Sequence, residues 1–147
     1  IDEFRMSWQR KEIEMVNELN EKVFKRDPLR VISSAFSSID VINSNYIKEL
    51  KYRKNYHSKA FNNWIIEKIK YDFLINQAKI DDKIPGYICK FNDGKYIAWN
   101  LHKVKEPKWY KKSLPKTSEI KGGDRTFVDK DVGDLMLEDG VELICES

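Results

Sequence analysis

The spacing of the hydrophobic residues changes near Pro85-Gly86, and this change constrains the fold more than any other feature of the sequence. Before it, apolar residues recur every three or four positions, which is typical of helices with one buried face. After it, apolar and polar residues alternate around Asp93-Gly94, a dipeptide that favours a two-residue hairpin turn. Helices followed by an antiparallel sheet predict an α+β domain. We therefore expect about four N-terminal helices packed on a small antiparallel sheet built from two Asp-Gly hairpins.

The helical half is predicted to contain four amphipathic segments. They start at Ser7, at Asp27-Pro28, near residues 43–45 and at Ser58, and each start carries a residue type that caps helices or occupies their first turn. In the first segment Glu12 is expected to face water. The apolar stripes are Trp8, Met15, Val16, Leu19 and Val23 in the first segment; Leu29, Ile32, Phe36 and Ile39 in the second; Tyr46, Ile47 and Leu50 in the third; and Phe61, Trp64, Ile65, Ile69 and Phe73 in the fourth.

The second half is predicted to contain two hairpins. A two-residue turn at Asp93-Gly94 would pair Phe91 with Tyr96, Cys89 with Ala98 and Ile88 with Trp99. A second Asp-Gly, at residues 139–140, predicts a hairpin between residues 135–137 and 141–145, although residues 131–137 could instead form a short helix. Residues 126–128 could add a strand. Residues 103–125 contain two prolines and a Gly-Gly pair and are expected to form a long loop, a feature that is commonly functional in a compact domain.

The length of 147 residues suits one domain. We assign residues 1–5 to a vector-derived remnant and residues 6–147 to a single α+β domain, with a helical part at 6–82 and a sheet part at 83–147. The two cysteines, Cys89 and Cys145, are too few for a disulfide scaffold and predict an intracellular protein, cytoplasmic or nuclear. No apolar run approaches the roughly 18 residues of a membrane span, so no membrane partner is expected.

The charge of the chain is divided between its two ends. Residues 1–123 carry 25 Lys and Arg against 16 Asp and Glu, a net of +9, whereas residues 124–147 carry 2 against 8, a net of −6. A basic surface attracts polyanions, so nucleic acid is the first partner to consider. Lys outnumbers Arg by 21 to 6, which disfavours base-specific readout and, with the abundant Ile and Asn, is compatible with the AT-rich genome of a virus or phage.

Two basic segments are interleaved with aromatic residues. Cations contact phosphates and exposed rings stack on unpaired bases, so these segments predict a small, non-enzymatic protein that binds nucleic acid, RNA or DNA, or a nucleic-acid-handling complex. We expect the Trp109 ring to be exposed; the alternative is a solvated lysine-rich face with Trp109 and Tyr110 packed inward. The predicted binding residues are Lys51, Tyr52, Arg53, Lys54, Tyr56 and Lys59 in the first segment and Lys108, Trp109, Tyr110, Lys111 and Lys112 in the second.

Two other functions remain open. A metal-independent ribonuclease could use His102 as general acid or base, with Lys103 and Arg125 stabilising a pentacoordinate phosphate. An adaptor or inhibitor could bind a protein partner through the acidic residues Asp129, Asp131 and Asp134. The sequence offers no means of separating these alternatives from nucleic-acid binding.

Metal and cofactor sites are not expected. Asp124, Asp129, Asp131 and Asp134 could gather a divalent cation, but they lack the spacing of a calcium loop. Cys89, Cys145, His57 and His102 could in principle bind zinc, but no two of them have the spacing of zinc ligands. Gly122-Gly123 lacks the remaining residues of a phosphate-binding loop, which disfavours nucleotide hydrolysis.

Overall fold

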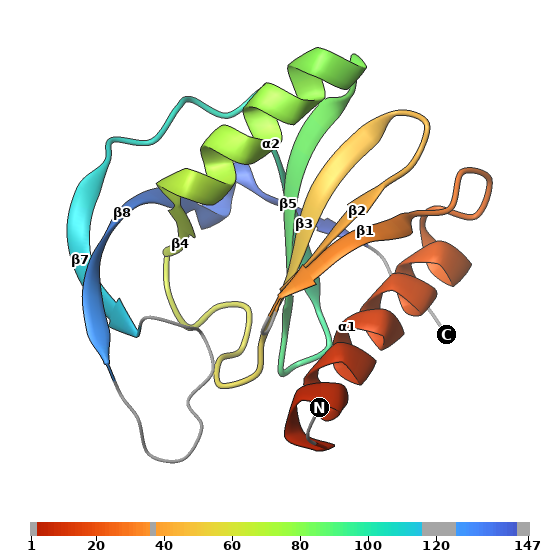
Figure 1. The fold of residues 1–147 in the computed structure, drawn as a ribbon, viewed down its shortest axis with the longest axis horizontal. Coiled ribbons are helices and arrows are strands. Elements are labelled where there is room, and N and C mark those ends of the chain that lie inside the picture. The colour runs from red at the N-terminus through yellow and green to blue at the C-terminus, as the bar shows by residue number, and fades with distance from the viewer. Residues whose placement is uncertain (1–2, 36–37, 116–125, 144–147) are drawn as a thin grey trace.

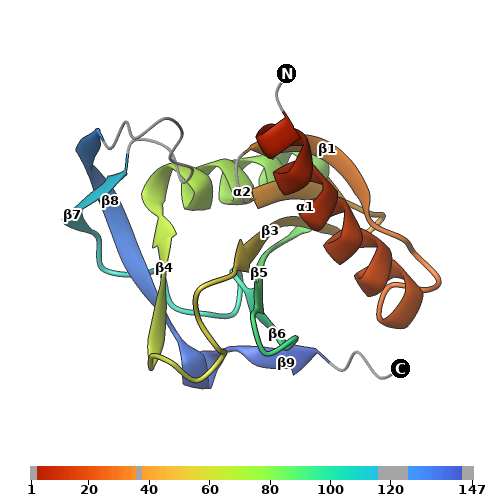
Figure 2. The same cartoon turned by 90° about the horizontal axis from the view of Figure 1, so that it is seen from below.

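The computed structural model describes residues 3–35, 38–115 and 126–143 (Figures 1 and 2). For residues 3–9 and Ala35 it describes the backbone alone. Two helices and nine strands make up this part of the chain, and the strands form two sheets. The elements are α1 (Glu3–Lys22), β1 (Arg30–Ala35), β2 (Ser38–Ile42), β3 (Tyr46–Arg53), β4 (Asn63–Glu67), α2 (Lys68–Asp81), β5 (Ile84–Phe91), β6 (Tyr96–Asn100), β7 (Tyr110–Pro115), β8 (Phe127–Met136), the short 3-10 helix η1 (Leu137–Asp139) and β9 (Val141–Leu143).

The larger sheet, sheet A, has the strand order β1-β2-β3-β5-β6-β9 and forms the centre of the molecule. Its strands are antiparallel except for β3 and β5, which run parallel because the chain between them passes through β4 and α2 before it returns. The smaller sheet, sheet B, has the order β4-β8-β7 and is antiparallel. Helix α1 covers one face of sheet A, and α2 with sheet B covers the other (Figures 1 and 2).

Helix α1 confirms the first predicted helix, although it begins at Glu3, within the five residues that we had set aside. Met15, Val16 and Leu19 are buried against sheet A, as their spacing predicted. Glu12 was expected to face water but is fully buried, since it lies one turn before Met15 and Val16 on the same stripe. No helix in the described ranges is long and apolar enough to cross a membrane.

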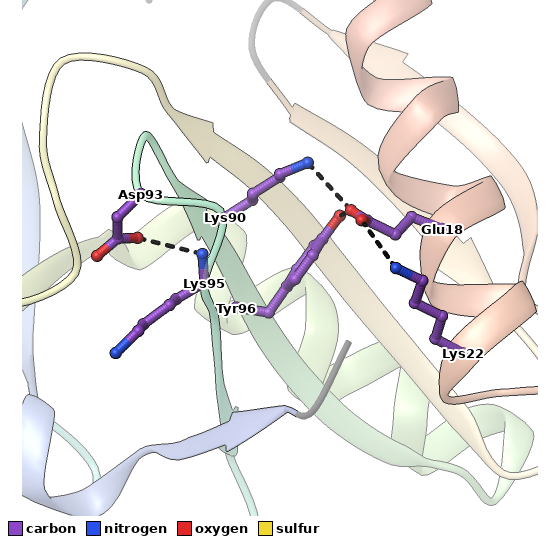
Figure 3. A network of polar contacts seen from close by, with 6 residues as sticks. All are labelled: Glu18, Lys22, Lys90, Asp93, Lys95 and Tyr96. Atoms are coloured by element: carbon purple, nitrogen blue, oxygen red, sulfur yellow. Dashed lines mark hydrogen bonds and ion pairs between the residues drawn. The ribbon is translucent and has the colours of Figure 1, made fainter. Parts of the chain in front are cut away.

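Polar contacts also hold α1 on sheet A (Figure 3). Glu18 accepts hydrogen bonds from the Tyr96 hydroxyl and from Lys90 Nζ, the latter at 3.0 Å, and Lys22 Nζ lies 3.8 Å away. Partial burial opposes ionisation of Glu18, but the hydrogen bonds from Tyr96 and Lys90 hold its pKa below the usual value. The carboxylate therefore connects the C-terminal part of α1 to β5 and β6.

The prediction of about four helices on a small sheet is wrong. Residues expected in the second and third helices form β1, β2 and β3, and the fourth predicted helix is divided between a loop, β4 and the start of α2. Five of the eleven residues in β1 and β2 are β-branched, and β3 contains Ile47 and two tyrosines, residue types that favour strands. Four consecutive residues of β3, from Ile47 to Leu50, are buried because both faces of the sheet are covered, so the alternation that marks an exposed strand is absent.

The first predicted hairpin exists, but with a different register. Tyr96 pairs with Lys90, Ala98 with Ile88 and Trp99 with Tyr87, one residue away from the expected pairing. The turn contains three residues, since Phe91 N donates to Lys95 O at 3.0 Å and Gly94 adopts a positive φ of 84°. A third turn residue shifts every cross-strand pair by one position.

The second predicted hairpin does not form. Residues 137–139 form η1, Gly140 has a φ of −89°, and β9 pairs with β6 in sheet A rather than with β8 in sheet B. Residues 131–137 are mostly strand, so the helical alternative is also wrong, whereas the predicted strand near residue 128 is part of β8. The predicted long loop contains β7; residues 103–109 before it form turns and loop, and residues 116–125 after it lie outside the described part of the chain.

Candidate nucleic-acid interface

Two aromatic rings are exposed side by side in the loop of residues 54–62, which connects β3 to β4. Tyr56 and Phe61 are 42% and 50% exposed, and their ring centroids are 5.3 Å apart in an edge-to-face arrangement. Beneath them the buried Trp64 contacts both rings, at 5.7 Å from Tyr56 and 5.3 Å from Phe61. Trp64 in turn packs on the buried Phe91 of β5 at 4.7 Å. The two exposed rings are therefore supported by the hydrophobic core.

The same loop is anchored to the β5–β6 turn by hydrogen bonds. Ser58 donates to Asp93 Oδ2 from its backbone nitrogen at 3.0 Å and from its hydroxyl at 2.7 Å, and Asn92 N donates to Tyr56 O at 2.9 Å. Slight burial works against ionisation of Asp93, but the bonds from Ser58 lower its pKa. Because Ser58 itself is buried, this contact fixes the middle of the loop.

Three further residues of the loop are basic or titratable and exposed. Lys54, His57 and Lys59 all face solvent, and the Lys59 backbone nitrogen donates to His57 Nδ1 at 3.3 Å. Lysine ammonium groups beside exposed rings can contact phosphates while the rings stack on bases. Tyr56, Phe61, Lys54, His57 and Lys59 make up what we call the loop 54–62 platform.

Lys51 and Arg53, which the sequence predicted to bind nucleic acid, instead lie on the face of β3 that is covered by α2 and sheet B. Both are half-buried, and burial, followed by repulsion from Arg53, lowers the pKa of Lys51. Arg53 Nη2 donates to Ile65 O of β4 at 2.8 Å and to the Tyr87 hydroxyl at 3.2 Å. Its guanidinium carbon lies 5.5 Å from the centre of the Trp64 ring. Arg53 therefore connects sheet A to sheet B.

Tyr52 points to the opposite face of sheet A. It is half-buried beside the α1 core, and Lys11 Nζ of α1 lies 5.9 Å from the centre of its ring. The structure thus divides the first predicted segment into an interior part, residues 51–53, and an exposed part, residues 54–59.

Trp109, in the second predicted segment, is half-buried rather than exposed. Its ring lies 5.1 Å from the Tyr71 ring of α2, and its indole nitrogen donates to Glu106 Oε2 at 2.9 Å. A Cβ atom at Gly133 would come within 3.0 Å of this ring, so the glycine allows Trp109 to lie directly on β8. The position is consistent with the alternative in which Trp109 packs inward.

The remaining residues of the second segment are exposed, but two of them are already paired with carboxylates of β8. Lys111 Nζ lies 2.9 Å from Asp131 Oδ1, and the Tyr110 hydroxyl donates to Asp134 Oδ1 at 2.7 Å. This hydrogen bond is the main reason that the pKa of Tyr110 is raised to about 12. Lys108 and Lys112 are exposed as well, and Lys112 lies opposite Lys130 in the strand register, where Lys130 pairs with Glu67 at 3.4 Å.

The two predicted segments do not form one continuous patch. Loop 54–62 leads into Asn63, the first residue of β4. Tyr110 lies near the other end of β4, because it pairs with Val132 of β8, and Val132 in turn pairs with Glu67, the last residue of β4. Asn63 and Glu67 are four residues apart, about 13 Å along the strand. In Figure 2 the loop lies at the start of β4, whereas β7 lies toward the end of β4 that leads into α2.

The residues of the two alternative functions are only partly described. His102 and Lys103 are exposed in a turn after β6, where the His102 backbone nitrogen donates to Asn100 Oδ1 at 2.9 Å, while Arg125 lies outside the described residues. Asp129 is exposed on β8 opposite Ser113. Asp124 and Cys145 also lie outside the described residues, Cys89 is fully buried, and no group of three or more potential metal ligands occurs in the described part.

The burial of several ionisable side chains on β2 and β3 was not predicted from the sequence. Glu49 is buried under α2, where Lys70 Nζ lies 3.4 Å from its Oε1, and burial raises the pKa of the carboxyl despite this cation. Asp40 of the neighbouring strand accepts a hydrogen bond from the Ser33 hydroxyl at 2.7 Å. On the opposite face, Lys48 is buried with its Nζ 4.2 Å from the centre of the Tyr46 ring. These groups have polar or aromatic partners, which favours a structural role for them.

Phe61 is the platform residue that sequence reasoning placed in the core. Its assignment followed from helical spacing with Trp64 and Ile65. The Asn62-Asn63 pair, followed by a short run of large apolar residues, was the available signal for a turn before a strand.

No family model matches the chain, and the comparisons with curated proteins and with solved structures found no match. The function must therefore be inferred from the residues and their geometry.

Proposed function

We propose that this protein is a non-enzymatic, nucleic-acid-binding protein that holds single-stranded RNA or DNA on the loop 54–62 platform. The observation that supports this proposal is the pair of exposed rings, Tyr56 and Phe61, supported by Trp64 and flanked by the exposed Lys54 and Lys59. Large exposed apolar groups that cluster on a rigid base are typical of binding sites. Rings next to cations are typical of sites for unpaired nucleotides.

The chemistry of the platform favours binding without sequence specificity. Every base has a face on which an aromatic ring can stack, and lysine contacts phosphate as a point charge rather than through a two-pronged hydrogen bond. The five platform side chains offer few fixed donors and acceptors for reading base edges, since His57 Nδ1 already accepts a hydrogen bond from the Lys59 backbone nitrogen. We therefore expect similar affinities for single strands of different sequence, and weaker binding of duplexes, whose bases are already stacked.

Lys108 and Lys112 would add phosphate contacts for a longer strand that reaches β7. Lys111 would contribute less, because Asp131 already neutralises it at 2.9 Å. The acidic residues of β8 would then act mainly as an electrostatic screen for the basic strand beside them.

The proposal is tested by fluorescence anisotropy with labelled single-stranded RNA and DNA at several salt concentrations. Tyr56→Ala and Phe61→Ala should each weaken binding by about fivefold to a hundredfold, the usual loss when one stacking ring is removed. Phe127→Ala, which removes a ring that is 52% exposed on β8, is the matched control and should leave affinity unchanged. Equal affinities for the parent and both platform variants would contradict the proposal.

Lysine variants test the electrostatic part of the same site. Lys54→Ala and Lys59→Ala should each flatten the plot of log affinity against log salt by roughly 0.7 for one lost contact with a single strand. Lys25→Ala, an exposed lysine after α1, serves as the control. The same samples should be examined for RNA cleavage in the presence of a chelator, since chelator-insensitive cleavage lost in His102→Ala would favour the ribonuclease alternative.

A further inference from the structure

Helix α2 is apolar on two faces. Tyr71, Leu74 and Ala78 face inward and are buried against sheets A and B. On the outward face, Ile69 and Ile80 are 74% and 75% exposed. Single exposed apolar residues are ordinary on protein surfaces, but a stripe of them along one helix marks an interaction surface. A third large residue, Phe73, lies on the same stripe and is 41% exposed.

The outward stripe has the spacing of a coiled-coil seam. Its positions 69, 73, 76 and 80 are separated by four, three and four residues, which is the alternation of the two core positions in a heptad repeat. The third position is occupied by Asn76, which is exposed. One polar residue among apolar seam positions commonly determines the register and orientation of the partner helix.

The charges beside the stripe are complementary to a second copy of the same helix. Asp72 and Lys79 are seven residues apart and lie on the same flank of the stripe. When two identical helices pack antiparallel, the same flank of each helix lies against that flank of the other. Asp72 of each copy would then lie beside Lys79 of the other copy, and Asn76 would lie near the two-fold axis. On the other flank Asp81 borders the stripe, whereas Lys70 is directed inward to Glu49 of β3 at 3.4 Å, so the complementary charges are those of Asp72 and Lys79.

These charges are held at the surface by contacts within the helix. Lys68 Nζ donates to Asp72 Oδ2 at 2.6 Å, and Gln77 Nε2 donates to Asp81 Oδ2 at 2.9 Å. The acidic groups therefore border the stripe in ordered positions. A parallel arrangement of two copies would place unlike flanks together and would separate Asp72 from Lys79.

We propose that the outward face of α2 is a homodimer interface in which two copies of the chain pack this helix antiparallel. The helix has 14 residues and a length of about 21 Å, and it presents only three large apolar side chains, so the interface would be smaller than that of a stable dimer. We expect dissociation constants on the order of tens of micromolar. In Figure 1 the helix lies on the opposite side of the molecule from loop 54–62, so a dimer would leave both platforms free.

Sedimentation equilibrium of the full chain over a hundredfold range of concentration tests the proposal. The parent should convert from monomer to dimer within this range, whereas Ile80→Asp should remain monomeric. Ile13→Asp changes an isoleucine of α1 that is 48% exposed and should dimerise as the parent does. Thermal melting by circular dichroism verifies that each variant is folded. A parent that stays monomeric throughout, or a dimer that Ile80→Asp does not weaken, would overturn the proposal.

A charge exchange tests the antiparallel orientation. Asp72→Lys and Lys79→Asp should each weaken the dimer, by roughly tenfold over the two symmetric contacts, because each places like charges together. The double variant Asp72→Lys/Lys79→Asp should regain most of the parent affinity. Asn76→Leu should tighten the dimer because it replaces a polar seam residue with an apolar one. If the double variant dimerises no better than the single ones, the antiparallel pairing is wrong.

Discussion

Lys48 is a buried cation whose partners in the described structure are aromatic rings. Its Nζ lies 4.2 Å from the centre of the Tyr46 ring and 5.9 Å from that of Phe24, and a Cβ atom at Gly86 would come within 2.7 Å of it. Rings stabilise an ammonium group less than water does when the site is otherwise dry. Burial therefore lowers the pKa of Lys48 from 10.5 to about 8.

This pKa makes the free energy of unfolding depend on pH. Below about pH 8, Lys48 is protonated in both the folded and the unfolded chain. Between about pH 8 and 10.5 it is protonated only in the unfolded chain. Because the unfolded chain binds more protons there, the free energy of unfolding rises with pH across this window. The rise attributable to Lys48 is at most about 3 kcal/mol. Lys48→Met should be more stable than the parent at pH 7, and its advantage should shrink as the pH approaches 10.5. Urea titrations of both proteins measure the difference, and a constant difference across the window would contradict the prediction.

At the scale of elements, the contact between sheets A and B passes through Arg53. Strand β4 is the edge of sheet B nearest to β3, and its Ile65 carbonyl accepts a hydrogen bond from the Arg53 side chain at 2.8 Å. The same guanidinium contacts the Tyr87 hydroxyl and the Trp64 ring. One side chain of β3 thus donates a hydrogen bond to a backbone carbonyl on the edge strand of sheet B.

Arg53→Ala should reduce the free energy of unfolding by about 3 kcal/mol, because it removes charge-assisted hydrogen bonds from a half-buried position. Arg53→Lys should recover little of the loss, since an ammonium group cannot reach both acceptors with the planar geometry of the guanidinium. Lys54→Ala, at the next and exposed residue, should change stability by less than about 0.5 kcal/mol. Urea denaturation compares the three variants, and similar values for Arg53→Ala and Lys54→Ala would show that Arg53 does not join the sheets.

At the scale of the whole molecule, the opposite charges of the two ends of the chain meet in sheet B. Strand β7 carries lysines and β8 carries aspartates, and the two strands pair along their length. The ion pair between Lys111 and Asp131 and the hydrogen bond from Tyr110 to Asp134 cross this boundary. This pairing leaves the formal net charge of +3 unchanged, but it reduces the positive electrostatic potential beside β7.

Replacing Asp129, Asp131 and Asp134 together by Asn should tighten the binding of single-stranded nucleic acid and make it more dependent on salt. The reason is that Lys111 becomes available to a phosphate and the negative potential next to β7 is removed. If the three carboxylates instead hold a metal, magnesium or calcium should raise the melting temperature of the parent but not of the variant. Anisotropy titrations and thermal melts on the same samples measure both effects. Unchanged affinity would contradict the role of these residues as a screen.

Local sequence determined the elements whose signals depend on near neighbours. The stripe of Met15, Val16 and Leu19 predicted α1, because a helix covering one face of a sheet keeps its 3.6-residue period. The alternation around Asp93-Gly94 predicted β5 and β6. The basic and aromatic residues 51–59 predicted a binding segment, of which Lys54, Tyr56 and Lys59 are exposed. In each case the signal comes from residues close together along the chain, or from the separation of apolar side chains in the core from charged side chains in solvent.

Tertiary structure alone decided the elements whose environment is supplied by distant parts of the chain. Strands β2 and β3 are covered on both faces by α1 and α2, so their sequences lack alternation and resemble short helices. The chain leaves sheet B after Met136 and joins β6 of sheet A, which no local turn signal at Asp139-Gly140 could reveal. The packing of sheet B against sheet A also places Arg53 in the interior while Lys54 remains in solvent, although both are basic residues in one segment. Burial of this kind depends on which surfaces meet in three dimensions, and residue type alone does not specify it.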